Sequence, residues 1–186
     1  LLLKEGDEIS LIKEGAVSQL ASAGFYLTCT LPQIIEDVKE NQSIWFDDGI
    51  IGGKIIQKGK EELVIQITQA APEGTKLKRE KGINLPQTKL NLPSLTEADK
   101  SNLDFVVNHA DVVGYSFVRT PEDVQDLQQE LAKRNASEMG IVLKIENAEA
   151  FQNLPSLILK GLESPSLGIM IARGDLAVEL GAERLS

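Results

Sequence analysis

Hydrophobic and polar positions follow two alternating periods in the second half of the chain. Three segments carry apolar residues at helical spacing, and they alternate with three short apolar runs typical of buried strands. The helical segments are 96–108, 120–134 and 148–160, and the strand-like runs are 111–118, 140–145 and 167–172. Thr96 and Thr120 each begin a Thr-x-x-Asp sequence, which predicts a capped helix start. This alternation predicts parallel strands with right-handed crossovers, as in doubly wound sheets and (β/α)8 barrels.

The first half contains short apolar runs separated by Gly-rich turns. We expect strands over 7–13, 24–30, 43–46, 50–58 and 62–69. We also expect a short helix over 32–39 and a polar loop over 72–79. Asp47-Asp48-Gly49 is predicted to be a turn rather than a metal site. Several short strands at this spacing predict a small β barrel or sandwich.

Charge and composition narrow the function classes. The chain has 186 residues, with 28 Asp and Glu against 19 Lys and Arg and a formal net charge of −9. This balance argues against a nucleic-acid binder, which usually carries a basic stripe. No apolar run approaches the roughly 18 residues of a membrane span, and no secretory signal pattern is visible. The single cysteine, Cys29, excludes an internal disulfide and a multi-cysteine zinc site, and it fits a cytoplasmic location.

Polar side chains follow all three predicted strands of the second half. The strand-end sequences are Ser116-Phe117-Val118-Arg119, Lys144-Ile145-Glu146-Asn147 and Arg173-Gly174-Asp175. In parallel α/β folds, the carboxyl ends of the strands form the active face. Charged residues at three successive strand ends therefore predict a functional site there.

The residue types at these strand ends suit a divalent cation and an anionic substrate. Lys144 and Glu146 lie two apart in a strand, so they share a face at a spacing of ~6.6 Å. Two carboxylates, Glu146 and Asp175, suit Mg²⁺, while a lysine stabilises developing negative charge. Gly174 and a following helix would let backbone N–H groups approach an anion. A plainer interpretation stays open: Lys144 pairs with Glu146 or Arg173, and Asp175 caps a helix from Leu176 onward.

Five motifs in order carry a resemblance to a known family. They are IWFDDGII, KGINLP, LTEADKSNLDFVVNHADVVGYSFVR, KIEN and GIMIARGDLAVE. Together they resemble pyruvate kinase. The resemblance implies an α/β fold in which residues 88–186 supply about strands 4–6 of a (β/α)8 TIM barrel, a partial A domain. Residues 1–87 would form an inserted, small all-β lid, the B domain.

The resemblance also implies roles for individual residues. Glu146 and Asp175 would hold Mg²⁺ or Mn²⁺, and Lys144 would stabilise the transferring phosphoryl group and the enolate. Gly174 and Asp175, with Ala172 nearby, would contact the carboxylate of phosphoenolpyruvate or pyruvate. Lys81 would approach the phosphates of ADP or ATP.

Neighbouring residues have roles that stay open. Lys76, Lys78 and Arg79 make the stretch before Lys81 basic, although a solvated loop is an alternative interpretation. Ser116 and Phe117 would shape the substrate pocket, with core packing an equal explanation for Phe117.

The implied activity is that of a glycolytic phosphotransferase. In the intact protein, phosphoenolpyruvate and ADP would give pyruvate and ATP in the cytoplasm, and a homo-oligomer is expected. Potassium ligands would lie outside this chain, as would part of the phosphate clamp, so the isolated 186-residue chain is expected to be inactive. Ala177 and Gln87 stand where the family usually has glycine. These departures suggest a divergent branch.

Two other function classes stay open at this point. A metal-dependent lyase or aldolase acting on a pyruvate enolate would use a similar Glu and Asp pair. A non-catalytic protein could instead bind phosphorylated metabolites. Of the remaining residues, His109 is expected on the surface or at a helix end, and Cys29 and Trp45 in a core.

Overall fold

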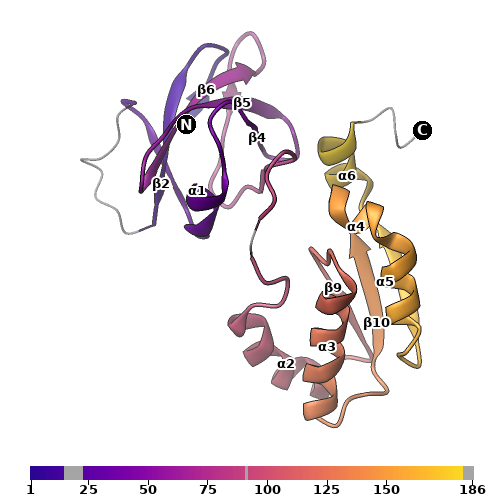
Figure 1. Cartoon of the computed structure of the whole chain (residues 1–186). Helices are drawn as coiled ribbons and strands as arrows, with labels where there is room; N and C mark the ends of the chain where they lie inside the picture. Colours follow the sequence, from indigo (N-terminus) through magenta and orange to yellow (C-terminus); the bar gives the residue numbers. More distant parts are fainter. Residues whose placement is uncertain (15–22, 91, 182–186) are drawn as a thin grey trace. The chain divides into compact units, whose positions relative to one another are not determined.

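The computed structural model describes residues 1–14, 23–90 and 92–181. The chain divides into two compact units, Leu1–Leu92 and Pro93–Ser186, which are drawn in Figure 1. Their roles as lid and partial barrel, with the boundary predicted after residue 87, stay predictions. Each unit is described by itself.

The first unit is built mainly from strands. Its main sheet has six strands in the order β3-β2-β6-β5-β4-β8, and β1 pairs with β7 in a separate two-stranded sheet. Neighbours in the main sheet are antiparallel except β2 and β3, which are parallel. The elements are β1 (Leu2–Leu3), β2 (Glu8–Lys13), β3 (Tyr26–Cys29), α1 (Gln33–Asp37), β4 (Ser43–Phe46), β5 (Ile51–Lys58), β6 (Glu62–Gln69), β7 (Thr75–Lys76) and β8 (Ile83–Asn84).

Strand β7 corrects the expected loop over 72–79. Leu2 pairs with Lys76 and Leu3 with Thr75, so two residues of the polar segment add to a sheet with the start of the chain. A two-residue strand is too short to show hydrophobic alternation, so the sequence pattern could not reveal it. The other strands predicted in the first half are confirmed within one to two residues at their ends.

The predicted turn after β4 is confirmed and has a defined backbone geometry. The Ile50 N–H donates to the Asp47 carbonyl at 3.1 Å, and φ is +53° at Asp48 and +83° at Gly49. Positive φ at both central residues defines a type I′ turn, for which Asp-Gly is a preferred sequence because its twist matches that of a hairpin. The turn thereby sets the register of β4 against β5.

The core of the first unit is dominated by isoleucine and leucine side chains. Ile9, Ile44, Ile55 and Ile65 are fully buried, as expected for β-branched residues on the inner face of a sheet. Trp45, predicted to be in the core, is only half-buried. Its ring occupies the space over Gly52, where a Cβ atom would lie 2.6 Å from the Trp45 ring.

Cys29 lies in the same core at 7% exposure, which confirms that prediction. Burial raises the pKa of its thiol. The two observations together describe a packed, protonated side chain.

The second unit has three parallel strands in the order β11-β10-β9, with helices between them. Its elements are α2 (Glu97–His109), β9 (Val112–Tyr115), α3 (Pro121–Lys133), β10 (Gly140–Ile145), α4 (Ala148–Gln152), α5 (Leu154–Gly161), β11 (Leu167–Ile171) and α6 (Arg173–Leu180). Thr96 and Thr120 both form complete capping boxes, with Asp99 and Asp123 respectively, which confirms the predicted helix starts.

The helix expected over 148–160 is two helices. It breaks at Asn153, which ends α4 and begins α5, and Pro155 is the second residue of α5. Proline has no N–H to donate and clashes with the preceding turn in a helix interior, so it fits only at a helix start. The proline therefore restarts the helix instead of being tolerated within it.

Side chains of β10 alternate between two environments, as predicted. Ile141, Leu143 and Ile145 are buried in the core between the sheet and the helices, whereas Val142 and Lys144 are half-buried on the other face. Figure 1 shows α3 and α5 running beside the sheet on its covered side. Lys144 therefore projects from the face of the sheet that these helices do not cover.

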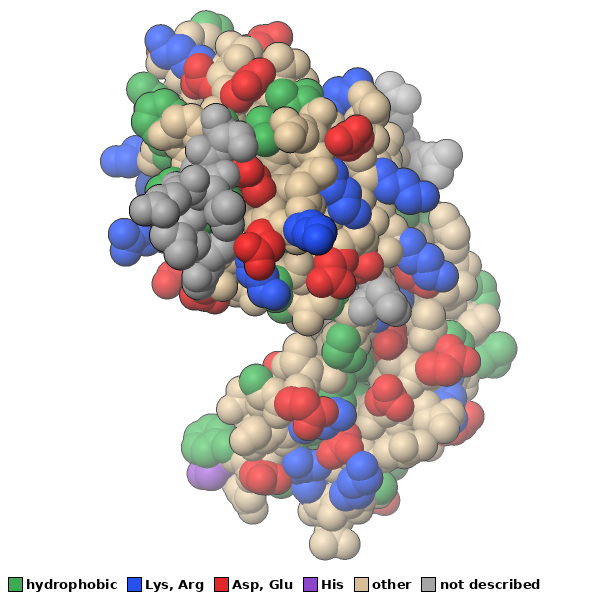
Figure 2. Space-filling model, turned by 60° about the vertical axis from the view of Figure 1, so that its left-hand side comes forward, with side chains coloured by type: hydrophobic (Ala, Val, Ile, Leu, Met, Phe, Trp, Pro, Cys, Tyr) green, Lys and Arg blue, Asp and Glu red, His purple; other side chains and the backbone are tan. Residues whose placement is uncertain are grey.

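The surface and the helix lengths complete the fold. Figure 2 shows one face of the molecule on which acidic and basic side chains are interspersed. Among the described helices, none has both the length and the apolar character needed to traverse a bilayer.

His109 is exposed at the end of α2, as predicted, and its ring stacks on Phe105 at 4.0 Å between centroids.

Candidate active site at the carboxyl ends of three strands

The parallel register brings the three polar strand ends to one edge of the sheet. Leu143 pairs with Tyr115 of β9, and Ile145 pairs with Ile171 of β11. The residues that follow each strand therefore lie at the same end. In Figure 1 the tip of β10 points towards α4 and α6, which begin there.

Lys144 and Glu146 form the centre of a hydrogen-bonded group at this edge. Lys144 Nζ lies 2.7 Å from Glu146 Oε1 and donates to Ser116 Oγ at 2.7 Å. The Glu146 side chain is almost fully buried, whereas the Lys144 side chain is 30% exposed. A buried carboxylate is stable only when paired and hydrogen-bonded, and this pairing provides that. The Lys144–Glu146 pairing of the plainer interpretation is therefore confirmed.

The second oxygen of Glu146 is held by the backbone. The Phe117 N–H donates to Glu146 Oε2 at 2.7 Å. A carboxylate has about four lone-pair sites, so these two contacts leave acceptor positions on both oxygens. The pairing with Lys144 thus does not exhaust the capacity of Glu146 to bind a cation.

The structure contradicts core packing as the explanation for Phe117. Its side chain is 62% exposed, so it does not fill the core. Its φ is +55°, a left-handed conformation that is rare for bulky residues. The predicted buried strand over 111–118 is therefore wrong at Phe117, because β9 ends at Tyr115.

The third strand end leads directly into α6. The Ala172 N–H donates to the Ile145 carbonyl at 3.0 Å, which continues the pairing between β10 and β11. The helix begins at Arg173 with Ala172 as its N-cap, so Asp175 is its third residue. Asp175 is therefore not the N-cap, and the expectation that it caps a helix from Leu176 onward is wrong. Leu176 is fully buried and anchors this first turn.

Gly174 lies in the same turn with open space in front of it. A Cβ atom built at Gly174 would meet no atom within 4 Å. The first N–H groups of a helix have no partner within the helix, and the helix dipole is positive there. The first turn of α6 is thus chemically suited to an anion.

The donor set at this edge suits a cation with few protein ligands. Within the described ranges, no group of three or more His, Cys, Asp and Glu side chains could hold a metal ion. Mg²⁺ typically takes one or two carboxylates and completes its shell with water and substrate oxygens. Glu146 and Asp175 fit that pattern, and their role as ligands stays a prediction.

Lys81, the predicted nucleotide-binding residue, belongs to the first unit. Its Nζ lies 2.7 Å from Asp47 Oδ1, in the turn between β4 and β5. The hydrogen bond to Asp47 raises the pKa of Lys81, and the charges of Asp47 and Asp48 act in the same direction. Lys76, which lies in β7, is exposed, and so are Lys78 and Arg79, as the solvated-loop interpretation expects of the latter two. Lys81 is thus a cation paired with Asp47 in the first unit.

Sequence reasoning named Asn147 at a strand end without predicting its contacts, and it missed Ser94 beside the site. Ser94 Oγ donates to the Phe117 carbonyl at 3.0 Å, and Asn147 Nδ2 donates to the Val118 carbonyl at 3.3 Å. Asn147 also caps α4 by accepting from the Ala150 N–H. An Asn directly before a helix is a readable cap signal, so the capping role of Asn147 could have been predicted. Ser94 is far from Phe117 in sequence and offered no such signal.

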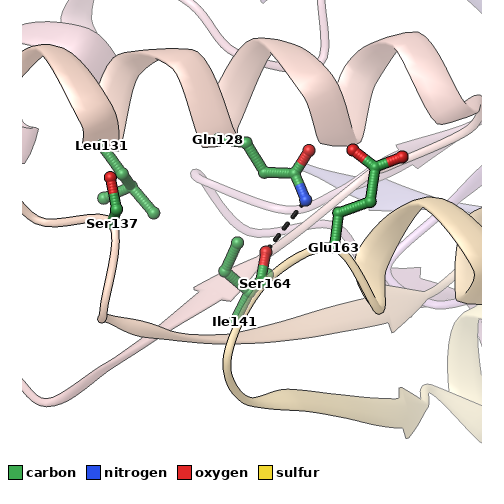
Figure 3. A pocket seen from close by; sticks show the side chains of 6 residues that line it. All are labelled: Gln128, Leu131, Ser137, Ile141, Glu163 and Ser164. Carbon is green, nitrogen blue, oxygen red and sulfur yellow. Dashed lines mark hydrogen bonds between the residues drawn. The ribbon is translucent and has the colours of Figure 1, made fainter.

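A separate hollow of about 210 Å³ lies at the opposite ends of the strands. Figure 3 shows its lining side chains, with Gln128 Nε2 donating to Ser164 Oγ at 2.9 Å. The hollow lies beside Ile141 at the start of β10. It is therefore distinct from the strand-end group around Glu146.

Comparisons with known proteins give one consistent result. Residues 1–186 match the family described as "Pyruvate kinase, barrel domain". The chain is 36% identical over 162 residues to a pyruvate kinase of Bacillus licheniformis, which covers 86% of this chain and 26% of the relative. It is 33% identical over 186 residues to a pyruvate kinase of Geobacillus stearothermophilus, covering 98% and 30%. It is 31% identical over 182 residues to pyruvate kinase 1 of Trypanosoma brucei brucei, covering 97% and 34%. The chain thus spans about a quarter to a third of these relatives.

Proposed function

Because the chain belongs to the pyruvate kinase family, we propose that it supplies the metal- and phosphoryl-binding part of a phosphotransferase. The reaction proposed is that of phosphoenolpyruvate with ADP to give pyruvate and ATP. The observation that carries the proposal is the Lys144, Glu146 and Phe117 group at the strand ends. Phosphoryl transfer requires mainly positioning and electrostatic stabilisation, which such a group provides.

Glu146 and Asp175 would hold Mg²⁺ or Mn²⁺ in this proposal. The cation would supply positive charge that binds substrate oxygens and stabilises developing negative charge. Two carboxylates leave most of the coordination shell to substrate and water, as a reaction on a phosphate ester requires. The buried position of Glu146 supports this role, because a low-dielectric surrounding strengthens its electrostatic interactions.

Lys144 would stabilise the charge that moves during the reaction. Its ammonium group is already oriented by Glu146 and Ser116. It is partly exposed, so a substrate can reach it from the uncovered face of the sheet. A lysine is a compact point charge with three donors, so it can contact a phosphoryl oxygen and an enolate oxygen while keeping one protein contact.

The first turn of α6 would bind the carboxylate end of the substrate. The N–H groups of Gly174 and Asp175, with Ala172 nearby, would donate to that carboxylate. Lys81 would contact the nucleotide phosphates from the first unit, acting as a lid. Since Lys81 is paired with Asp47, a phosphate must replace or join that carboxylate. Potassium, if required, would bind outside this chain.

The other function classes draw no support from the comparisons, since each relative reported above is named a pyruvate kinase. Activity can be tested in a hybrid protein. The matching stretch of the Geobacillus stearothermophilus enzyme is replaced by this chain, and pyruvate release from phosphoenolpyruvate and ADP is measured. We expect turnover, and we expect Lys144→Met to lower kcat by at least about 100-fold, the scale of losing one electrostatic stabiliser.

A control and a contrary result complete this experiment. Lys133→Met replaces a lysine whose ion pair with Glu130 lies on α3 and should leave turnover unchanged. Circular dichroism checks that each hybrid is folded. Equal turnover in folded Lys144→Met and parent hybrids would contradict the proposal.

A further inference from the structure

Phe117 adopts a backbone conformation that its own side chain does not explain. A φ of +55° is unfavourable for an aromatic residue, and it persists only where surrounding structure holds it. The side chain is 62% exposed, so burial of the ring does not compensate. The compensation must come from the peptide groups on either side of Phe117.

Both of those peptide groups make a hydrogen bond with a side chain. The Phe117 N–H donates to Glu146 Oε2 at 2.7 Å, and Ser94 Oγ donates to the Phe117 carbonyl at 3.0 Å. Ser94 precedes α2, whereas Phe117 follows β9, so the contact ties two separate segments together. The left-handed turn at Phe117 is therefore held from both ends.

This arrangement divides the two oxygens of Glu146 between unlike partners. Oε1 faces the ammonium group of Lys144, which sits on a flexible side chain, while Oε2 faces a backbone N–H. A backbone donor cannot swing away when a substrate or cation approaches. The Phe117 N–H therefore holds Oε2 in place independently of Lys144.

We propose that the Phe117 peptide, locked by Ser94, is a positioning group that orients Glu146 to bind a divalent cation. The cation itself rests on the proposed function. Hydrogen bonds to a ligating carboxylate typically change metal affinity by 10- to 100-fold. Neither the Phe117 N–H nor the Ser94 hydroxyl would touch the cation.

The test measures Mn²⁺ binding to the whole chain by electron paramagnetic resonance. Phe117→Val places a β-branched residue at the left-handed position and should weaken Mn²⁺ binding about tenfold. Ser94→Ala should weaken binding by a smaller factor, and Ser94→Thr should restore it because the hydroxyl is kept. Phe117→Gly, which adopts positive φ freely, should retain most of the affinity.

Asn135→Val is the matched control. Asn135 is exposed just after α3 and has a φ of +56°, so the substitution imposes the same backbone penalty away from the site. It should lower stability about as much as Phe117→Val while leaving Mn²⁺ affinity unchanged. Equal loss of affinity in both variants would show that general destabilisation, and not positioning, is responsible, and would overturn the inference.

A metal-free measurement separates this inference from the proposed function. The amide proton of Phe117, observed by NMR, should lie downfield because it donates to a carboxylate, and Glu146→Gln, which leaves only a neutral acceptor oxygen, should reduce that shift. Phe117→Val should reduce it as well. If the parent chain binds no Mn²⁺, the proposed function fails. The inference that Phe117 orients Glu146 for a cation then fails too, even where the NMR shift shows the hydrogen bond. If the parent binds Mn²⁺ and Phe117→Val binds it equally well, the inference alone is overturned.

Discussion

Tyr115 carries a buried hydroxyl group next to the candidate site. Its Oη has no hydrogen-bond partner of good geometry within the described residues. Hydrogen bonding to the Ser94 side chain nevertheless acts to lower the pKa of Tyr115. Burial is the stronger effect and raises the pKa of Tyr115, with the charges of Asp123 and Asp126 acting in the same direction. The neutral phenol is thus strongly favoured in the folded state.

This predicts a loss of stability at high pH. The unfolded chain releases the Tyr115 proton near pH 10, whereas the folded chain keeps it. Raising the pH above 10 therefore stabilises the unfolded state relative to the folded state. The free energy of unfolding should fall by up to about 1.4 kcal/mol per pH unit above pH 10. Urea denaturation at pH 9 and pH 11 measures it.

Tyr115→Phe is the control for that prediction. The variant should be as stable as the parent or up to about 1 kcal/mol more stable at pH 7, because it removes an unpartnered polar group. It should lose less stability between pH 9 and pH 11. An identical pH dependence in both proteins would contradict the assignment.

Single residues also mark the limit of what the sequence could predict. The pairing of Lys144 with Glu146 follows from the two-residue period of a strand, so it was foreseeable. The conformation of Phe117 depends on its contact with Ser94, which comes from a different segment. No local pattern encodes such a contact. No local pattern indicated either that α6 begins at Arg173, two residues before Asp175.

At the scale of elements, α3 begins with a cap that also holds the segment after Phe117. Asp123 Oδ2 accepts from the N–H groups of both Arg119 at 2.8 Å and Thr120 at 3.0 Å. The Asp123 side chain is only 13% exposed, so water would poorly replace those bonds. The carboxylate therefore fastens the β9–α3 connection to the helix.

Asp123→Ala should be clearly destabilising for this reason. Two backbone donors would lose their acceptor, which costs about 1–3 kcal/mol in the free energy of unfolding. Asp123→Asn keeps an acceptor oxygen at the same position and should lose less than half of that. Urea denaturation of the three proteins is the measurement, and equal stability of the Ala and Asn variants would contradict this account of the cap.

The elements were largely predictable because their signals are local. Capping boxes at Thr96 and Thr120 and the alternation along β10 each depend on neighbours within four residues. The break at Asn153 was also encoded, by Pro155, but its effect on the helix was underestimated. Strand β7 was hidden because its partner is the start of the chain, more than seventy residues away.

Over the residues that the structure describes, the second unit contains three parallel strands. A (β/α)8 barrel has eight, and it normally requires about 250 residues. The chain spans 26% to 34% of the relatives described above. The complete activity is therefore a proposal that concerns more than these 186 residues.

The isolated chain should accordingly show no meaningful turnover of phosphoenolpyruvate with ADP. Three strands can position Lys144 and Glu146 but cannot enclose a substrate, and exclusion of water contributes to electrostatic catalysis. A coupled assay of pyruvate release, run with the hybrid protein as a positive control, tests this. Turnover of the isolated chain at a rate similar to the hybrid would contradict it.

The proposed function depends on Glu146 and Asp175 binding a divalent cation together. A Mn²⁺ titration of the whole chain followed by electron paramagnetic resonance tests it directly, using the parent, a Glu146→Gln and Asp175→Asn double variant, and a Glu163→Gln control. Glu163 lines the hollow at the opposite ends of the strands. We predict one Mn²⁺ per parent chain and per control chain, and loss of that binding in the double variant. Undiminished Mn²⁺ binding by a folded double variant would contradict the account.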